Sequence, residues 1–363
     1  MTHHTGWASF AGRIATDAVE CVDVRAEPGR LATGTWFVVA DFEGRARAWR
    51  FDRVADAVTP DPEGGDRWRG PAPADWTTSM DQAAYEAAVR RVRHHVRAGD
   101  VYQANVCRVL SAPLPATTQE PDARALAARL AAGNPAPHAA AVHVPASSGL
   151  DPVWVVSASP ELYLAVRRGP DGTVVGSGPI KGTARTPDGL TEKDRAENVM
   201  ITDLVRNDLQ TVCRPGTVAV TSLLAVEEHP GLVHLVSRVQ GTVRDDTARS
   251  GVLWRELLDG TFPPGSVSGA PKSSALRIIR ELEPVPRGPY CGAVGWVDDG
   301  EASLAVGIRT FWWADHVLRF GTGAGITWGS DPTAEWRETE LKAERLVGLA
   351  STAVSDPAAT VEV

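Results

Sequence analysis

The chain has 363 residues and a formal net charge of −8, from 45 acidic and 37 basic side chains, and 43% of its residues are hydrophobic. This length and near-average composition predict a globular protein of one large or two ordinary domains and exclude collagen, coiled-coil and disordered classes. The acidic balance argues against a nucleic-acid partner, because phosphate affinity comes mainly from clustered Lys and Arg side chains.

The first 75 residues are predicted to form a small opening layer of strands and loops. Residues 35–40 (TWFVVA) are rich in aromatic and β-branched side chains typical of a strand, and 46–51 are expected to pair with them. A loop rich in Pro, Gly and Asp follows at 59–73.

A helix is predicted from the cap Asp81 to about residue 98, ending at Gly99. Its apolar side chains recur at helical spacing, at Ala84, Val89, Val92 and Val96.

Beyond a strand at 101–110, predicted helices and strands follow one another to the end of the chain. We expect helices at 121–132, 191–208, 250–258, 270–282 and 332–350, and strands at 138–145, 152–157, 161–167, 217–227, 232–241, 290–297, 302–313 and 316–321. Hairpin-like loops at 168–172 and 298–300 indicate antiparallel pairing. The pattern favours an α+β fold of antiparallel sheets and helical layers over a parallel doubly wound sheet.

Membrane and secretory signals are absent from the sequence. No stretch approaches the ~18 consecutive apolar residues of a membrane span, and the first twenty residues lack a basic start followed by an apolar run. The four cysteines are far apart in sequence and form no CxxC pair, which favours reduced thiols over a disulfide framework or a zinc site. We therefore expect a cytoplasmic protein with no membrane partner.

Lysine is rare in this chain. Of the 37 basic residues, only Lys181, Lys193, Lys272 and Lys342 are lysines. Arg cannot replace Lys where a neutral amine or a compact ammonium is required, so each lysine is either a chance survivor on the surface or a functional group.

Two predicted helices each present a pair of carboxylates three residues apart. Asp194 and Glu197 share one face of the first helix, and Glu335 and Glu338 share one face of the last, with Lys342 a turn further on. Together such pairs could form an oxygen-only site for Mg²⁺, although acidic pairs are also ordinary on solvated helix faces.

Glycine-rich segments and isolated polar residues complete the pattern. GSGPIKGTAR, FPPGSVSGAPK and GTGAGI let backbone N–H groups approach phosphates or carboxylates, but none has the spacing of a nucleotide-binding loop. Glu161, His234 and Arg309 stand in apolar strand contexts, where each either faces a cleft or is a satisfied core residue.

Eight segments in order carry a family resemblance: PIKGT, KDRAENVMITDLVRNDL, VHLVSRVQG, GSVSGAPK, RGPYCGAVGW, IRT, GAGI and ETELKA. The ordered set resembles the chorismate-binding enzymes, a family that includes anthranilate, aminodeoxychorismate, isochorismate and salicylate synthases. The resemblance runs from about residue 81 to 349. It implies a single large α+β domain, with residues 76–363 as the chorismate-binding catalytic part and residues 1–75 as a small opening portion of the same fold.

The resemblance also implies a Mg²⁺ cofactor and a set of site residues. Glu197 and Glu338 match direct Mg²⁺ ligands, and Asp194 and Glu335 match ligands that act through water. Glu161 matches the general acid that protonates the departing hydroxyl, and His234 matches an active-site histidine. The substrate-binding set that the resemblance implies is Gly182, Ser266, Tyr290, Arg309, Gly323, Ala324, Gly325 and Lys342, with Arg309 and Tyr290 clamping a carboxylate.

Three residues bear on the reaction within this family. Gln103 stands where relatives that add water have a basic lysine, which favours the members that use ammonia. Lys181 stands where aminodeoxychorismate synthases have Lys and the others Ala, and Thr183 lies two residues on in the same motif. A neutral Lys181 amine would attack the ring and then be displaced by ammonia.

The resemblance therefore implies conversion of chorismate and ammonia to 4-amino-4-deoxychorismate, for folate or an aminobenzoate-derived product. The alternatives are an anthranilate-forming enzyme, for which Lys181 would be dispensable, and a non-catalytic chorismate-binding subunit. No cysteine lies in the glycine-flanked context of a fused glutaminase, so the expected ammonia source is a separate glutamine amidotransferase subunit.

Overall fold

The computed structural model describes residues 6–56, 64–115, 120–184, 186–229 and 232–352. The strands are β1 Trp7–Phe10, β2 Arg13–Asp23, β3 Thr35–Ala40, β4 Ala46–Asp56, β5 Thr77–Thr78, β6 Gln103–Pro113, β7 His138–Val144, β8 Val153–Ser159, β9 Leu162–Gly169, β10 Gly172–Gly178, β11 Ile180–Ala184, β12 Ala219–His229, β13 Leu232–Thr242, β14 Gly269–Ala270, β15 Ala293–Asp298, β16 Glu301–Val306, β17 Thr310–Ala314 and β18 Val317–Ile326. The helices are α1 Gln82–Ala98, α2 Ala123–Gly133, α3 Glu192–Gln210, α4 Asp245–Arg249, α5 Leu253–Thr261, α6 Lys272–Leu282 and α7 Pro332–Ala350. A short 3-10 turn, η6 Gly265–Val267, also bears on the site.

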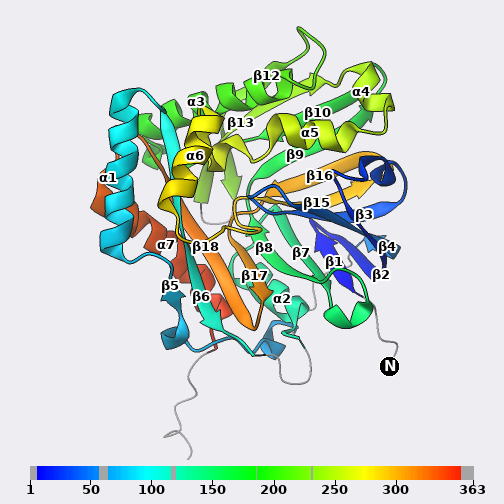
Figure 1. Cartoon of the computed structure of the whole chain (residues 1–363), viewed down its shortest axis with the longest axis horizontal. Coiled ribbons are helices and arrows are strands. Elements are labelled where there is room, and N and C mark those ends of the chain that lie inside the picture. Colours follow the sequence, from blue (N-terminus) through cyan, green and yellow to red (C-terminus); the bar gives the residue numbers. More distant parts are fainter. Residues whose placement is uncertain (1–5, 57–63, 116–119, 185, 230–231, 353–363) are drawn as a thin grey trace, which may run out of the picture.

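Eighteen strands of the described residues form one sheet in which every pairing is antiparallel (Figure 1). From edge to edge the order is β5, β6, β18, β17, β8, β7, β1, β2, β4, β3, β15, β16, β9, β10, β13 and β12, with β14 beside β6 and β11 beside β13. The predicted α+β fold with antiparallel strands is thus confirmed, and its strands form a single continuous sheet.

The four N-terminal strands lie in the middle of this sheet. β1 pairs with β7 on one side, with Trp7 opposite His143, and β3 pairs with β15 on the other, with Ala40 opposite Ala293. Strands β1 to β4 therefore join one half of the sheet to the other. Their aromatic side chains, including Trp36, Phe37 and Trp49, are buried in the largest apolar cluster of the protein.

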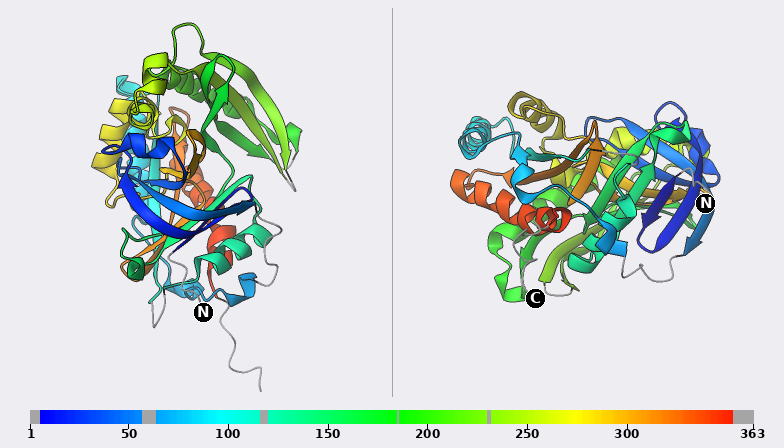
Figure 2. Two further views of the ribbon diagram at one scale, coloured as in Figure 1. Left: turned by 90° about the vertical axis from the view of Figure 1, so that its right-hand side faces the viewer. Right: turned by 90° about the horizontal axis from the view of Figure 1, so that it is seen from below.

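Helices cover the sheet in separate groups (Figure 2). α1, α6 and α7 pack near β6 and β18, α3 packs against β11, β12 and β13, and α2 packs against β7 and β8. None of the helices in the described parts of the chain is long and apolar enough to cross a membrane.

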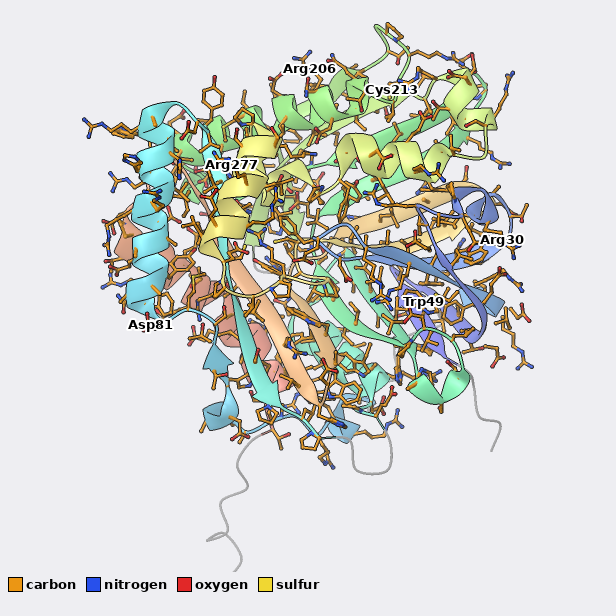
Figure 3. The ribbon with its side chains drawn as sticks, viewed as in Figure 1. Arg30, Trp49, Asp81, Arg206, Cys213 and Arg277 are labelled. Atoms are coloured by element: carbon orange, nitrogen blue, oxygen red, sulfur yellow. The ribbon has the colours of Figure 1, made fainter. Side chains whose placement is uncertain are left out.

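Local sequence signals explain where the long helices begin and end. The Asp81 carboxylate accepts a hydrogen bond from the Ala84 N–H at 2.8 Å, and Gly99 closes α1 in the left-handed conformation with φ 82°. Figure 3 shows Asp81 at the N-terminal end of α1. At α7, Asp331 accepts from the Ala334 N–H at 2.9 Å and Pro332 occupies the first turn.

Several predicted elements between residues 250 and 326 differ from the structure. The single strand expected at 302–313 is two strands, β16 and β17, because the chain turns at residues 307–309 and Arg309 adopts φ 53°. The strand expected at 316–321 continues to Ile326, because the glycine-rich segment pairs with β6 rather than forming a loop. The helix expected at 250–258 is α5, and the separate short α4 was not predicted.

Candidate active site

Lys181, Glu161 and Ser266 meet from three separate parts of the chain: a strand, a turn between two strands and a 3-10 turn. Lys181 lies on β11 where the pairing with β13 shifts register between Ile180 and Thr183, and such bulges redirect side chains. The Lys181 Nζ donates a hydrogen bond to the Ser266 carbonyl oxygen in η6 at 3.0 Å. Glu161 lies in the turn between β8 and β9 and is 4% exposed.

Burial moves the pKa values of Glu161 and Lys181 toward each other. Desolvation raises the pKa of Glu161, against smaller lowering effects from Ser266, Lys181 and the Ile180 backbone. Desolvation also lowers the pKa of Lys181, although Glu161 and Glu197 oppose it. A carboxylic acid and an amine with shifts of this kind suit proton donation and nucleophilic attack.

The glycine after Lys181 is required by its surroundings. Gly182 has φ 85°, and a Cβ atom there would lie 2.8 Å from the Asp194 Cβ. A larger residue would be strained and would push α3 away from β11.

The four predicted carboxylates lie on α3 and α7, and two lysines lie among them. Lys193 Nζ is 3.7 Å from a Glu197 oxygen and 3.7 Å from a Glu335 oxygen, so it bridges the two helices. Lys342 Nζ is 2.6 Å from a Glu338 oxygen and donates to the Gly323 carbonyl at 3.1 Å.

Charge and burial affect these carboxylates differently. Burial raises the pKa of Glu335, with a further increase from Glu338 and opposing effects from Ser330 and the two lysines. Burial acts in the same direction on Glu338, but Lys342, Lys193 and Lys181 outweigh it and lower its pKa.

Asp194 caps its own helix. Its Oδ2 accepts hydrogen bonds from the Thr191 N–H at 2.8 Å and the Thr191 hydroxyl at 2.7 Å, while the Asp194 N–H donates to the Thr191 oxygen at 3.2 Å. This capping box directs one Asp194 carboxylate oxygen toward the start of α3. Asp194 therefore stabilises the helix whether or not a ligand is bound.

The donor set fits a hard cation such as Mg²⁺ held partly by water. The buried Glu197 Oε1 accepts no hydrogen bond from the described residues and has the Lys193 ammonium as an ion-pair partner at 3.7 Å, so it can still take a metal cation as a direct partner. Among the described residues no three His, Cys, Asp or Glu side chains form a ready-made metal cage. Mg²⁺ commonly takes one or two carboxylates and completes its shell with water and substrate oxygens.

Arg309 offers a positive charge that no described residue pairs with. Its guanidinium forms no hydrogen bond or ion pair with the described residues, and burial lowers its pKa. The positive φ of 53° and the bond from the Ala158 N–H to the Arg309 carbonyl fix the backbone here. A largely buried, unpaired guanidinium is suited to a carboxylate ligand.

Tyr290 is 5% exposed and packs against β18. A Cβ atom at Gly321 would lie 2.0 Å from the Tyr290 ring, so glycine makes room for the ring. The Cys107 thiol donates to the Tyr290 hydroxyl oxygen over 3.9 Å.

β18 has one open edge beyond Phe320. β17 pairs with β18 only as far as Phe320, and the Gly323 carbonyl on the open side accepts from Lys342. Because N–H and C=O groups of one residue point to the same side of a strand, the N–H groups of Gly323 and Gly325 also face the open edge. Ala324 alternates with them and directs its N–H toward β6.

Gln103 begins β6 and is fully buried. Its Nε2 donates to the Asn105 Oδ1 at 3.4 Å, and its Oε1 has no hydrogen-bond partner among the described residues. A Cβ atom at Gly325 would lie 2.4 Å from the Gln103 Nε2, so the two positions adjoin. The neutral amide of Gln103 cannot itself act as a base.

His234 lies on β13 opposite Thr183 of β11 and is 3% exposed. It therefore reaches the strand that carries Lys181. The side chain of Thr183 lies outside the part of the chain whose side chains the structure describes.

Two groups at the site were not assigned a role from the sequence. Lys193 was singled out only as a rare lysine, because its bridge to Glu335 joins residues 142 positions apart that a single sequence does not pair. Lys272 donates to the Asp208 carboxylate at 2.7 Å and to the Thr261 carbonyl at 2.9 Å.

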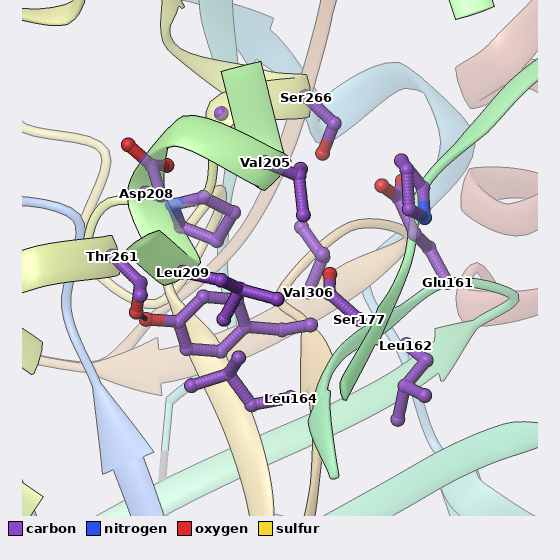
Figure 4. A pocket seen from close by; sticks show the side chains of 14 residues that line it. Glu161, Leu162, Leu164, Ser177, Val205, Asp208, Leu209, Thr261, Ser266 and Val306 are labelled. Atoms are coloured by element: carbon purple, nitrogen blue, oxygen red, sulfur yellow. Dashed lines mark hydrogen bonds between the residues drawn. The ribbon is translucent and has the colours of Figure 1, made fainter. Parts of the chain in front are cut away.

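A small cavity lies behind Glu161 and Ser266 (Figure 4). Its volume is about 20 Å³, which is room for a molecule the size of water or ammonia. Asp208 and Thr261 line its other end, where the Tyr163 and Thr261 hydroxyls are 2.6 Å apart.

Comparison with protein families gives a match over most of the chain. Residues 32–348 match the family described as chorismate binding enzyme. Anthranilate synthase component 1 from Streptomyces coelicolor is 38% identical over 288 residues, covering 75% of this chain and 52% of the relative. Aminodeoxychorismate synthase component 1 from Klebsiella aerogenes is 35% identical over 288 residues, covering 75% of this chain and 59% of the relative. The chain thus spans little more than half the length of these curated relatives.

Solved structures share the fold at low sequence identity. Anthranilate synthase component I from Streptococcus pneumoniae superimposes with a TM-score of 0.71 at 22% identity, covering 95% of this chain and 90% of that one. The menaquinone-specific isochorismate synthase from Escherichia coli gives 0.73 at 17% identity, covering 96% and 89%.

Proposed function

This chain belongs to the chorismate-binding enzymes, and from that premise we propose that it converts chorismate and ammonia to 4-amino-4-deoxychorismate, the reaction of an aminodeoxychorismate synthase component I. The observation that carries the proposal is the half-buried Lys181, which interacts with the buried Glu161, with the Lys181 pKa lowered by desolvation and the Glu161 pKa raised by it. A nucleophilic amine and a proton donor in one pocket are what two successive allylic displacements require.

In the first displacement, the neutral Lys181 amine forms a bond to ring carbon 2 of chorismate. The ring double bonds shift, the bond between carbon 4 and oxygen breaks, and the Glu161 proton passes to the departing hydroxyl, which leaves as water. In the second, ammonia bonds to carbon 4 and the electron pair of the bond to Lys181 returns to Nζ. The Glu161 carboxylate takes one proton from the new ammonium group, so the enzyme is restored and the net change is chorismate and ammonia to aminodeoxychorismate and water.

We assign a different set of binding groups to each of the two substrate carboxylates, and the two sets adjoin where Lys342 donates to the Gly323 carbonyl. The unpaired Arg309, with Tyr290 and the open N–H groups of Gly323 and Gly325, suits the enolpyruvyl carboxylate. Lys342 and the carboxylate cluster suit the metal-bound ring carboxylate.

The proposed cofactor is Mg²⁺. Glu197 and Glu338 would hold it directly, and Glu335 and Asp194 would do so through water. When bound, Mg²⁺ neutralises the ring carboxylate and makes the ring a better electrophile.

Ammonia is proposed to come from a separate glutamine amidotransferase subunit. The cavity next to Glu161 and Ser266 has room for one ammonia-sized molecule, and Gln103 provides no base that would activate water in its place.

The test is product analysis by mass spectrometry of the purified chain with chorismate, Mg²⁺ and ammonium. Wild type should form aminodeoxychorismate without releasing pyruvate, and Lys181→Ala should lose that product. Lys181→Arg should lose it too, because a guanidinium keeps the charge but cannot supply a neutral amine. Arg206→Ala on the exposed side of α3 is the control and should leave the product unchanged.

The second candidate is anthranilate synthase component I, favoured by the 38% identity to the Streptomyces coelicolor relative of that name. If wild type and Lys181→Ala both give anthranilate and pyruvate, this candidate is correct and Lys181 is not a nucleophile. An inactive wild-type chain would instead point to a chorismate-binding subunit.

A further inference from the structure

Lys193 sits between carboxylates that the proposed Mg²⁺ site would use. It extends from α3 toward Glu197 one turn along the same helix and toward Glu335 on α7, at 3.7 Å from an oxygen of each. Both distances exceed hydrogen-bond length, so the ammonium is held by charge more than by directed bonds. Glu335 is 4% exposed at its side chain, whereas Lys193 is 54% exposed.

The electrostatic surroundings of Lys193 are those of a counter-ion. Burial alone would lower its pKa, but Glu335, Glu197 and Glu338 together raise it. Its ammonium therefore compensates three carboxylates on two helices, and one of them, Glu197, has an oxygen with no hydrogen-bond partner among the described residues.

Lys342 differs from Lys193 in how it is attached. Lys342 is 2.6 Å from Glu338 and also donates to the Gly323 carbonyl, so backbone and carboxylate fix it together. Lys342 and Lys193 are about equally exposed, but among the described residues Lys193 makes two longer ionic contacts and no hydrogen bond, so its side chain can turn into solvent.

We propose that Lys193 is a displaceable counter-ion of the Mg²⁺ site, neutralising Glu197 and Glu335 until the ion binds and then turning out to solvent. A monovalent ammonium and a divalent ion repel each other within one set of carboxylates, so Mg²⁺ binding must break the Lys193 contacts. Mg²⁺ affinity is therefore lower than these carboxylates alone would give. The inference rests on the proposed function for the identity of the ion.

The test is Mg²⁺ binding measured by titration calorimetry without chorismate. Lys193→Gln should bind Mg²⁺ roughly three- to tenfold more tightly than wild type, because no cation has to be displaced. Lys193→Arg keeps the charge and should bind no more tightly than wild type. Arg195→Gln removes a neighbouring charge that pairs with the exposed Glu192, and its affinity should stay within about twofold of wild type.

A second measurement uses the wild-type protein only. Trace acetylation of lysines, read by peptide mass spectrometry, should label Lys193 more strongly when Mg²⁺ is present. Lys272, which is paired with Asp208, is the internal reference and should not change. With four lysines in the chain, each is read separately.

Equal or weaker Mg²⁺ binding by Lys193→Gln would overturn the inference, since Lys193 would then support the site rather than compete with the ion. Unchanged or reduced labelling of Lys193 would overturn it as well. If wild type binds no Mg²⁺, both this inference and the Mg²⁺ part of the proposed function are wrong. If the calorimetry agrees but no aminodeoxychorismate forms, the inference holds and the proposed reaction does not.

Discussion

Glu161 and Lys181 show how one buried environment acts oppositely on an acid and an amine. Desolvation favours the neutral form of each, so the Glu161 pKa rises and the Lys181 pKa falls. The two groups also interact, so their protonation steps belong to the pair. Both neutral forms are the ones that the proposed first displacement uses.

This pairing predicts a bell-shaped dependence of kcat/KM on pH. kcat/KM should rise with pH as Lys181 loses its proton and fall as Glu161 loses its own. Because the Lys181 pKa is lowered and the Glu161 pKa is raised, the rising limb is shifted to lower pH and the falling limb to higher pH. Glu161→Gln should lower kcat/KM roughly 10²- to 10⁴-fold and remove the falling limb, because an amide neither donates the proton nor titrates. The measurement is the initial rate of product formation across pH for both proteins. A Glu161→Gln profile that keeps the falling limb would show that another group provides the acid.

At the scale of single residues, the sequence supplies candidates but not their environments. Lys181, Glu161 and Arg309 could be chosen from motifs in a known order, but whether Arg309 finds a partner among the described residues depends on what packs around it. Lys193 was visible as a rare lysine, yet its position between Glu197 and Glu335 depends on how α3 and α7 approach each other.

At the scale of elements, α3 and α6 are tied by the ion pair of Asp208 and Lys272, 2.7 Å apart. Burial raises the pKa of Asp208 from 3.8 to about 6, with Lys272 opposing the shift. The folded state therefore binds the Asp208 proton more tightly than the unfolded state. The stability that this proton provides is present below pH 3.8 and is lost as pH rises through about 6.

The expected result is a pH-dependent difference between wild type and Asp208→Asn. Relative to the variant, the free energy of unfolding of wild type should fall by up to about 3 kcal/mol between pH 4 and pH 6. Urea denaturation at several pH values measures it. Gln210→Ala, a change of an exposed uncharged residue on the same helix, should give a flat difference. A flat difference for Asp208→Asn as well would contradict the raised pKa.

Element boundaries followed the sequence where caps and periodicity agreed, as at α1, α7 and β3. The boundaries differed from the prediction where pairing with a distant strand determined the secondary structure. Gly321 to Gly325 belong to a strand because β6 pairs with them, and the Tyr290 ring fills the space of the missing side chain at Gly321. The turn at Arg309 interrupts an apolar run that has no Pro, Gly pair or other strong turn signal after Gly307.

At the scale of the whole molecule, β1 to β4 complete a sheet whose other strands come later in the chain. β7 and β15 would both become open edges without them, and the cluster around Trp36 and Trp49 would lose its core. The N-terminal region that the sequence predicted only as a small opening layer is thus central to the sheet.

Deletion of residues 1–56 should therefore prevent folding. We expect aggregation on size-exclusion chromatography and no near-ultraviolet circular dichroism of ordered tryptophans, because two long edges and a large apolar surface are exposed. Val54→Ser, on the exposed side of β4, is the control and should fold normally. A monomeric deletion variant with a cooperative melting transition would show that the remaining strands close the sheet without β1 to β4.

The pairing of β3 with β15 also means that β3 is synthesised long before its partner strand. Ala40 pairs with Ala293, so roughly 250 further residues must be synthesised after β3 before β15 exists. At ordinary translation rates this takes on the order of 10 to 50 s. During that interval the edge of β3 and the side chains of Trp36 and Phe37 lack their final neighbours. Sheets built from such distant contacts fold slowly, so we expect the unpaired edge of β3 to be most exposed to aggregation while the chain is being made.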